Sequence, residues 1–320
     1  MKAIIRQKYG SPDVLQFEEV PKPTPGDDEV VVKLHAASVS SSDWEILTGS
    51  PYYVRPLFGI LEPRCKILGS DVAGRVEAIG RNVQRFQPGD EIFGDTLWAG
   101  FGGFAEYVCV PENTVLAQKP ASMSFAQAAT FPQAAVIALQ GLRDRGRVQA
   151  GQKVLINGAG GGAGSFAVQF AKSLGAEVTG VDSTRKLEMM RSIGADHVID
   201  YTQEDFTRNG QRYDLILDVA AHHSTFDYAR ALSPNGIYAV VGGRMLQTVF
   251  LGPWISMIGS KRMGLLRIQP NSEDLRRVGE LFEAGAMVPV IDKQFPLDEA
   301  VEALRYFGAG LARGKVVITM

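Results

Sequence analysis

The chain has 320 residues, 45% of them hydrophobic, and its 33 Lys and Arg side chains nearly balance 35 Asp and Glu. This length allows two domains, and a balanced charge without long runs of one sign argues against a nucleic-acid-binding surface. The start, MKAIIRQKYG, lacks the hydrophobic core of a signal peptide, and no apolar run is long enough to span a membrane, so we expect a cytoplasmic protein without a membrane partner.

The first third of the chain predicts a β domain. Three segments are rich in β-branched residues, and the turns PKPTPGDD and QPGD punctuate them: residues 29–39, 71–80 and 91–97. Short strands with this punctuation are typical of a rolled or barrel-like antiparallel sheet.

A different pattern begins in the middle of the chain. Residues 124–142, rich in Ala and Leu, predict a helix that Pro132 kinks. Strand-like and helix-like segments then alternate, which indicates a doubly wound parallel sheet and an α/β fold class. The predicted strands are 153–157, 176–182, 197–201, 213–220 and 236–243, and the predicted helices are 165–174, 185–194 and 225–232.

The C-terminal stretch indicates a return to the first domain. Residues 273–285 have the amphipathic pattern of a helix, and a β-like segment, 289–297, and a final strand, 315–320, follow it. We therefore expect one domain formed by residues 1–122 and 290–320, with a second domain, residues 123–289, inserted into it.

The segment INGAGGGAG, residues 156–164, joins the first strand of the alternating region to its first helix. Glycines in this context allow a tight turn, close approach of backbone N–H groups to a pyrophosphate, and close packing of the helix on the sheet. We expect a dinucleotide here, bound by Gly160, Gly161, Gly162 and Ala163. A glycine-rich turn without a ligand is the alternative.

The end of the next strand bears on the choice between NADPH and NADH. Asp182 stands where an acidic residue binds the ribose 2′-hydroxyl of NAD, but Ser183, Thr184, Arg185 and Lys186 follow it directly. Hydroxyl groups and cations favour the 2′-phosphate of NADPH. We expect NADPH, with NADH as the alternative, and we expect all of these residues except Thr184 to contact the cofactor.

Later strand ends should face the same crevice, because ligands of doubly wound sheets bind at the carboxyl ends of the strands. Val219 lies at the end of one strand, and Gly242 and Gly243 follow the next and leave room for the nicotinamide ring. His222 and His223 come soon after Val219. One of them is a candidate acid, although a surface pair in a loop is the more frequent case.

Several motifs together resemble the medium-chain dehydrogenase/reductase superfamily and, within it, the zinc-independent quinone oxidoreductases. They are GQKVLINGAGGGAGSFAVQFAK, ILGSDVAGRVEAIG, FQPGDEIFG, GGFAEYVCVP and RGKVVIT, which together span nearly the whole chain. The resemblance implies a GroES-like catalytic domain with an inserted Rossmann domain. It also implies a homodimer that uses NADPH to reduce quinones or α,β-unsaturated carbonyl compounds.

The zinc ligands of the superfamily's alcohol dehydrogenases have no counterpart at the aligned positions. Where those enzymes carry a cysteine three residues before an aspartate, this chain has Ser40 before Asp43; where they carry His-Glu it has Ser70-Asp71, and Gln133 replaces another cysteine. Hydroxyl and amide oxygens are poor ligands for Zn²⁺, and the four-cysteine structural site is also missing. We therefore expect a zinc-independent enzyme without a bound metal.

The remaining site residues also follow from the resemblance. Ser40 is expected to face the nicotinamide, Tyr52 to line the substrate cleft and Asp43 to orient a loop, and these three form the expected catalytic set. Lys315 lies near where a cation reaches the cofactor phosphates. The apolar segment 250–268 is expected at a dimer edge or in the cleft wall, and its composition does not decide between them.

Two other functions fit the same residues. One is a non-catalytic NADPH-binding protein with a sensing or structural role, since fold alone does not establish activity. The other is an NAD-dependent zinc-free dehydrogenase, for which Asp182 is the argument.

Overall fold

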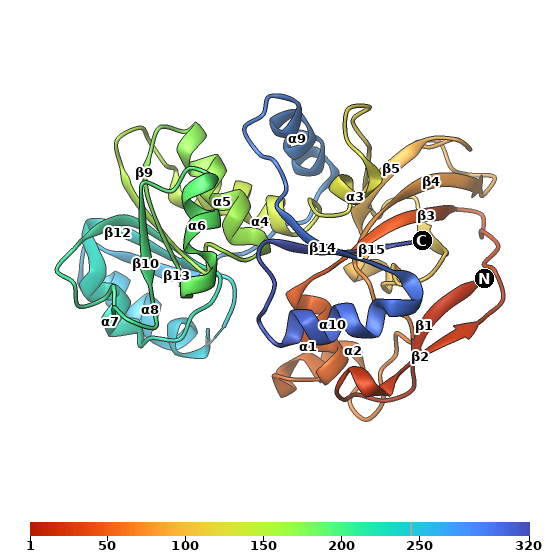
Figure 1. The fold of residues 1–320 in the computed structure, drawn as a ribbon, viewed down its shortest axis with the longest axis horizontal. Coiled ribbons are helices and arrows are strands. Elements are labelled where there is room, and N and C mark those ends of the chain that lie inside the picture. Colours follow the sequence, from red (N-terminus) through yellow and green to blue (C-terminus); the bar gives the residue numbers. More distant parts are fainter. Residues whose placement is uncertain (244) are drawn as a thin grey trace. The chain divides into compact units, whose positions relative to one another are not determined.

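The computed structural model describes residues 1–243 and 245–320, and it divides into two compact units (Figure 1). Unit 1 comprises residues 1–133, 270–283 and 291–320, and unit 2 comprises residues 134–269 and 284–290. Both termini belong to unit 1, so the chain leaves that unit, forms unit 2 and returns. The predicted α/β fold, a β domain that contains an inserted parallel-sheet domain, is confirmed.

Unit 1 is built on a seven-stranded sheet in the order β14-β15-β3-β4-β5-β7, with β6 also paired to β3. The pairs are antiparallel except β14–β15, and a separate antiparallel pair, β1–β2, lies beside this sheet. The strands are β1 Lys2–Arg6, β2 Leu15–Glu19, β3 Glu29–Val39, β4 Asp71–Ile79, β5 Glu91–Asp95, β6 Tyr107–Pro111, β7 Val115–Gln118, β14 Ile291–Pro296 and β15 Lys315–Thr319.

The long strand β3 connects the parts of this sheet. It pairs with β4 along one edge and with β6 and β15 along the other. Its alternate residues Val30, Val32 and Leu34 share one core cluster with Val72 of β4 and Ile92 of β5. Alternation that sends β-branched side chains to one face fills the interior of a rolled sheet.

The helices of unit 1 cover the edges and faces of its sheet. α3 packs against β3 and β4, α9 against β7, and α10 against β14 and β15. The helices of this unit are α1 Ser41–Thr48, α2 Arg55–Phe58, α3 Phe125–Ala128, α9 Ser272–Glu283 and α10 Ala300–Gly308.

The single helix predicted over residues 124–142 is two helices, and the break moves the domain boundary. Ser124 caps α3 through reciprocal hydrogen bonds with Gln127, and α4 begins only after Pro132, which has no N–H for a helical bond. The expected boundaries at 122 and 290 therefore differ from the observed ones. The first break falls after Gln133, and α9 belongs to unit 1 because it packs on β7.

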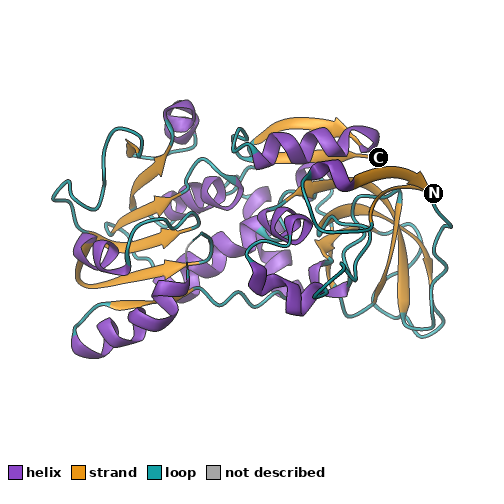
Figure 2. Ribbon diagram, turned by 90° about the horizontal axis from the view of Figure 1, so that it is seen from below, coloured by secondary structure: helices purple, strands orange, loops and turns teal. Residues whose placement is uncertain are grey.

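Unit 2 holds a six-stranded sheet in the order β10-β9-β8-β11-β12-β13, and all of its pairs are parallel (Figure 2). This order is that of a doubly wound dinucleotide-binding sheet, in which the polarity of winding reverses between β8 and β11. The strands are β8 Lys153–Asn157, β9 Glu177–Asp182, β10 His197–Asp200, β11 Tyr213–Asp218, β12 Leu232–Val240 and β13 Arg262–Leu265.

Helices α5 and α6 lie against β8, β9 and β10, while α7 and α8 lie against β12 and β13. Residues 250–268, which had no predicted structure, contribute the end of α8 and the edge strand β13. The helices are α4 Ala134–Gln140, α5 Gly162–Ser173, α6 Leu187–Ser192, α7 Thr225–Ala231 and α8 Leu246–Ile258.

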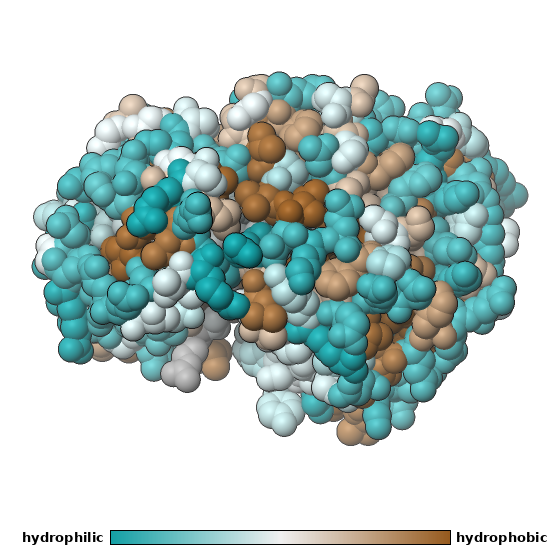
Figure 3. All heavy atoms as spheres, in the orientation of Figure 1, coloured by the Kyte–Doolittle hydropathy of each residue, from teal (hydrophilic) through white to brown (hydrophobic). Residues whose placement is uncertain are grey.

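The face of the molecule drawn in Figure 3 is mostly hydrophilic, and its hydrophobic groups form separate patches. None of the helices within residues 1–243 and 245–320 combines the length and the hydrophobicity that a membrane-spanning segment needs.

Candidate active site

Two glycines shape the loop between β8 and α5 because a side chain would not fit at either position. Gly158 has a φ of 83°, which favours glycine, and a Cβ on Gly164 would lie 2.1 Å from the Gly158 carbonyl oxygen. Gly161 is the N-cap of α5 and makes no side-chain cap. The first turn of α5 therefore presents its N–H groups without a capping side chain, as a site for a pyrophosphate requires.

Asp182 and Lys186 lie against this loop and against each other. The Asp182 Oδ2 atom accepts a hydrogen bond from Gly160 N at 3.0 Å, and Oδ1 accepts one from Ser183 N at 2.8 Å. The Lys186 ammonium is 3.5 Å from Oδ1, and its methylene chain covers Gly160. The carboxylate that would repel a 2′-phosphate thus has a cation beside it. The Thr184 hydroxyl donates to Asp200 instead.

The glycines after β12 serve close packing of two loops. A Cβ on Gly242 would lie 2.4 Å from the Val219 carbonyl oxygen, and one on Gly243, whose φ is 77°, would lie 2.3 Å from that of Ala221. Val219 in turn packs its side chain on Gly158. On the side where a Cβ would stand, Gly242 and Gly243 therefore face the backbone of residues 219–221, and the room that we expect them to leave for a nicotinamide ring stays a prediction.

A buried polar network that sequence reasoning missed holds the two strand ends together. Asp218, the last residue of β11, accepts hydrogen bonds from the Asn157 amide at 2.8 Å and the Tyr238 hydroxyl at 2.9 Å. Asn157 Nδ2 also donates to the Ala220 carbonyl. Burial raises the pKa of Asp218, and these donors oppose the rise. Asn157 ends a predicted strand, but Asp218 lies inside the predicted strand 213–220, and the two residues meet only because β8 and β11 pair.

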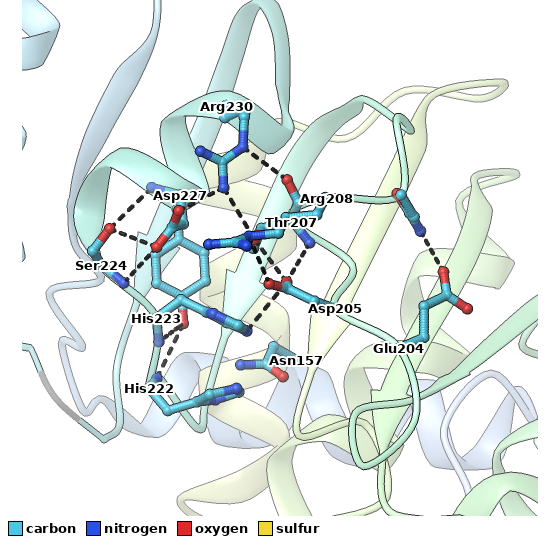
Figure 4. Close-up of polar contacts among 12 residues, drawn as sticks. Asn157, Glu204, Asp205, Thr207, Arg208, His222, His223, Ser224, Asp227 and Arg230 are labelled. Carbon is cyan, nitrogen blue, oxygen red and sulfur yellow. Dashed lines mark hydrogen bonds and ion pairs between the residues drawn. The ribbon is translucent and has the colours of Figure 1, made fainter.

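The first of the two histidines after β11 touches this network, since His222 Nδ1 lies 3.1 Å from the Ala220 carbonyl oxygen. Figure 4 shows the side chains of both histidines. The Tyr228 hydroxyl accepts hydrogen bonds from the backbone N–H groups of His222 and His223, at 3.1 and 3.3 Å. The His223 ring points toward Asp205, with Nε2 3.7 Å from Oδ1, and lies edge-on to Phe206. Burial, together with the charge of His222, lowers the pKa of His223, so it is a poor proton donor at neutral pH.

Unit 1 contains a second polar cluster around the start of α1. Ser40, 7% exposed, is the N-cap: its Oγ donates to Asp43 Oδ2 at 2.6 Å, and its N–H donates to the same oxygen at 2.9 Å. Asp43 Oδ1 accepts from Gly69 N at 3.1 Å and lies 3.4 Å from the Ser70 hydroxyl. Burial raises the pKa of Asp43 to about 6, although the Ser40 hydroxyl opposes the rise.

Two more buried carboxyl groups and one ammonium complete this cluster. Lys315 Nζ donates to Asp71 Oδ2 at 3.1 Å, and both side chains are buried. Lys315 therefore pairs with a carboxylate inside unit 1. We had expected its ammonium to reach the cofactor phosphates. Asp95 accepts hydrogen bonds from Leu97 N and the Gln133 amide. Burial, with the nearby charge of Asp71, raises the pKa of Asp95 to about 7.

The last expected catalytic residue lies apart from these contacts. Tyr52 is 76% exposed, and Arg55 stacks over its ring at 4.8 Å. At the aligned zinc positions, Ser40 and Ser70 lie 3.3 Å apart through their hydroxyl groups. Within the described residues, no three His, Cys, Asp or Glu side chains are grouped so that they could hold a metal ion.

Comparison with known proteins identifies the family. The family models "Alcohol dehydrogenase GroES-like domain" and "Zinc-binding dehydrogenase" match residues 26–121 and 193–318. The 2-methylene-furan-3-one reductase of Solanum lycopersicum is 33% identical over 329 residues, which cover 99% of this chain and 79% of that protein. The NADPH-dependent alkenal/one oxidoreductase of Arabidopsis thaliana chloroplasts is 30% identical, with 99% and 79% coverage. The structure of the quinone oxidoreductase from Coxiella burnetii superposes with a TM-score of 0.87 at 31% identity, covering 100% of this chain and 99% of the other.

The chain therefore belongs to the medium-chain dehydrogenase/reductase superfamily, among relatives that are quinone oxidoreductases and alkenal/one reductases. It is an oxidoreductase that uses a nicotinamide cofactor. The residues of unit 2 fit that cofactor, because the glycine loop leaves the start of α5 uncapped and Asp182 and Lys186 lie beside it.

Proposed function

We propose that the protein transfers a hydride from NADPH to a quinone or an α,β-unsaturated carbonyl compound, without zinc. The observation that carries the proposal is the glycine loop of unit 2, where Gly161 opens α5 and Lys186 lies over Gly160. Bound NADPH supplies the hydride. The chain's own residues hold the dinucleotide through backbone N–H groups and orient the electron-poor acceptor.

The donor atoms around Ser40 support a reaction without a Lewis acid. Ser40, Ser70 and Gln133 offer hydroxyl and amide oxygens that already hydrogen-bond to other groups of unit 1. Zn²⁺ is held in proteins by thiolate, imidazole and carboxylate ligands, so this set does not fit it. A quinone or an enone is already polarised and needs only a hydrogen-bond donor, for which we propose the linked hydroxyl groups of Ser40 and Ser42.

NADPH oxidation with a 1,4-quinone, a 1,2-quinone and an α,β-unsaturated ketone tests this function. We expect turnover with at least one acceptor and the same rate after treatment with a chelator. Tight NADPH binding without turnover would instead support a non-catalytic role, and loss of activity with the chelator would refute the metal-free reaction.

Lys186 supports NADPH as the preferred cofactor. Its ammonium lies 3.5 Å from Asp182 and is held at the loop, so a 2′-phosphate would meet a cation and a partly neutralised carboxylate. We expect Lys186→Met to weaken NADPH binding about 10- to 100-fold, the value of a charge-assisted hydrogen bond, and to change NADH binding little. Dissociation constants from nucleotide fluorescence measure both.

Lys172→Met is the matched control, because Lys172 lies on α5 but pairs with Asp196 at 2.8 Å. It should leave both affinities unchanged. An equal loss of NADPH and NADH affinity in Lys186→Met would mean that the lysine only shapes the loop. Tighter binding of NADH than of NADPH by the wild type would reverse the cofactor assignment.

The surface of α8 and β13 supports a homodimer. β13 is an edge strand, and α8 beside it exposes large apolar side chains, with Trp254 51% and Phe250 76% exposed. A hydrophobic helix next to an unpaired strand edge is suited to a symmetric contact with a second copy. We expect Trp254→Glu to halve the mass in sedimentation, whereas Trp98→Glu, which changes an exposed tryptophan of unit 1, should not.

The two free cysteines agree with a reducing compartment, and we propose that the protein is located in the cytoplasm.

A further inference from the structure

The reduction proposed above consumes a proton as well as a hydride. Hydride addition to the β-carbon of an enone breaks the C=C π bond, forms one C–H bond and leaves an enolate. The enolate becomes the saturated ketone only when its carbon or oxygen takes one proton. A quinone treated in the same way becomes a hydroquinone anion, which also takes a proton.

Unit 1 contains a hydrogen-bonded chain of hydroxyl groups that starts at a buried carboxyl group. Asp43 Oδ2 lies 2.6 Å from Ser40 Oγ, and Ser40 Oγ lies 2.7 Å from Ser42 Oγ. Ser42 Oγ donates to Gln133 Oε1 at 2.8 Å. Asp43 is fully buried, whereas Ser42 and Gln133 are half-buried, so the chain leads from the interior of unit 1 toward its surface.

We propose that Asp43 stores the proton for the reduction and delivers it through the hydroxyl groups of Ser40 and Ser42. This inference rests on the proposed function. The Asp43 O–H proton moves to Ser40 Oγ, the Ser40 proton to Ser42 Oγ, and the Ser42 proton to a substrate oxygen or carbon that takes the place of Gln133 Oε1. Asp43 is left as a carboxylate and regains a proton from solvent along the same chain.

The charges around Asp43 favour a stored proton. Asp71 and Asp95 are buried in the same cluster, and Lys315 is the ammonium paired with Asp71, while the Arg6 guanidinium also faces Asp43. Burial and the Asp71 charge raise the pKa of Asp43 to about 6, and the hydrogen bonds from Ser40 and the charge of Lys315 keep it from rising further. A carboxyl group in this range gives up its proton and regains it readily near neutral pH.

Asp95 does not fit the same role, although its pKa is raised to about 7. Its link toward the half-buried surface is the Gln133 amide, whose Nε2 donates to Asp95 Oδ1 at 3.2 Å. An amide N–H₂ group donates hydrogen bonds but does not accept a proton and pass another on, as a hydroxyl group does. Asp95 therefore serves as the control for a buried carboxyl group outside the hydroxyl chain.

Three serine variants test the route. Ser42→Ala removes the last hydroxyl and should lower kcat for an enone about 100-fold, the lower range for acid catalysis, while Ser42→Thr restores it. Ser41→Ala, on the exposed neighbouring position of α1, should leave kcat unchanged. Wild-type kcat should fall as the pH rises above 6, and the Ser42→Ala profile should be flat. Full activity of Ser42→Ala with the wild-type pH profile would overturn the route.

Infrared titration of the protein without cofactor tests the storage independently of turnover. The raised pKa of Asp95, about 7, gives a second protonated-carboxyl band, which Asp95→Asn removes. We expect the band that disappears near pH 6 to be absent in Asp43→Asn and to persist in Asp95→Asn and Ser42→Ala. The same band in Asp43→Asn would overturn the proposal. Asp43→Asn replaces one of the two oxygens that accept hydrogen bonds from Ser40 N and Gly69 N with a donor NH2 group, so if this variant does not fold, the Ser42 variants decide. A wild type that reduces no acceptor would refute the proposed function, while the band still reports whether Asp43 holds the proton.

Discussion

Gly164→Ala should lower the free energy of unfolding by about 3 kcal/mol, the upper range for overpacking, and abolish NADPH binding. The new Cβ would lie 2.1 Å from the Gly158 carbonyl oxygen and 2.7 Å from Ala159 Cα, and both are backbone atoms. Helix α5 cannot move away without cost, because Phe166 and Ala167 bury their side chains completely. Urea unfolding and fluorescence titration with NADPH measure the two effects.

Gly161→Ala separates the packing role of this loop from its binding role. Among the described residues other than its chain neighbours, only the Gly158 carbonyl oxygen, at 3.4 Å, would lie within 4 Å of the new Cβ, and the Gly161 φ of −93° suits any residue. We expect unchanged stability but NADPH binding weakened about 10-fold, or 1.4 kcal/mol, because a methyl group would stand where the pyrophosphate approaches the helix. Normal binding by Gly161→Ala would mean that the dinucleotide does not approach this part of the loop.

The architecture could be predicted because it depends on local patterns. The β-branched run of residues 29–39 became β3 with the same ends, and residues 153–157 became β8. The glycine loop was recognisable because its chemistry is contiguous in sequence. The structure of residues 250–268 could not be predicted, since this largely apolar segment lacks the periodicity that separates a helix from a strand.

The polar clusters could not be predicted in the same way, because their members are far apart in sequence. Asp71 and Lys315 are 244 residues apart and meet only after β15 has paired with β3. The resemblance to the superfamily suggested that Lys315 contacts a cofactor phosphate. Its side chain instead points into unit 1, where the buried Asp71 carboxylate needs a cation. Asp43 was expected to orient a loop, and its hydroxyl chain became visible only once Ser40, Ser42 and Gln133 had been located.

Removing one partner of the buried Lys315–Asp71 pair should destabilise unit 1 strongly, because the other charge is then left buried without a partner. Lys315→Met keeps the volume but leaves Asp71 buried without its cation, which costs about 3–5 kcal/mol. The double variant Lys315→Met/Asp71→Asn should recover most of this loss. If NADPH binding is normal in the double variant, the lysine acts through the fold, whereas a loss of binding there would restore the phosphate role.

The loss of unfolding free energy in Lys315→Met should also depend on pH. Burial raises the pKa of Asp71, and the Lys315 charge opposes that rise, so removing the lysine raises the folded-state pKa further above the unfolded value. Stability from a group with a raised pKa is present at low pH and lost as the pH rises through the folded-state pKa. Urea unfolding should therefore show a larger loss of unfolding free energy, relative to the wild type, at pH 8 than at pH 5.

Lys119→Met provides the matched control. Lys119 is as buried as Lys315, but its partner Glu91, at 3.0 Å, is 35% exposed and is also held by Arg75. Water can solvate that carboxylate once the cation is gone, so the deficit should be smaller and the same at pH 5 and pH 8. Equal deficits at the two pH values for Lys315→Met would mean that Asp71 is solvated as well and that the cluster is more open than its burial indicates.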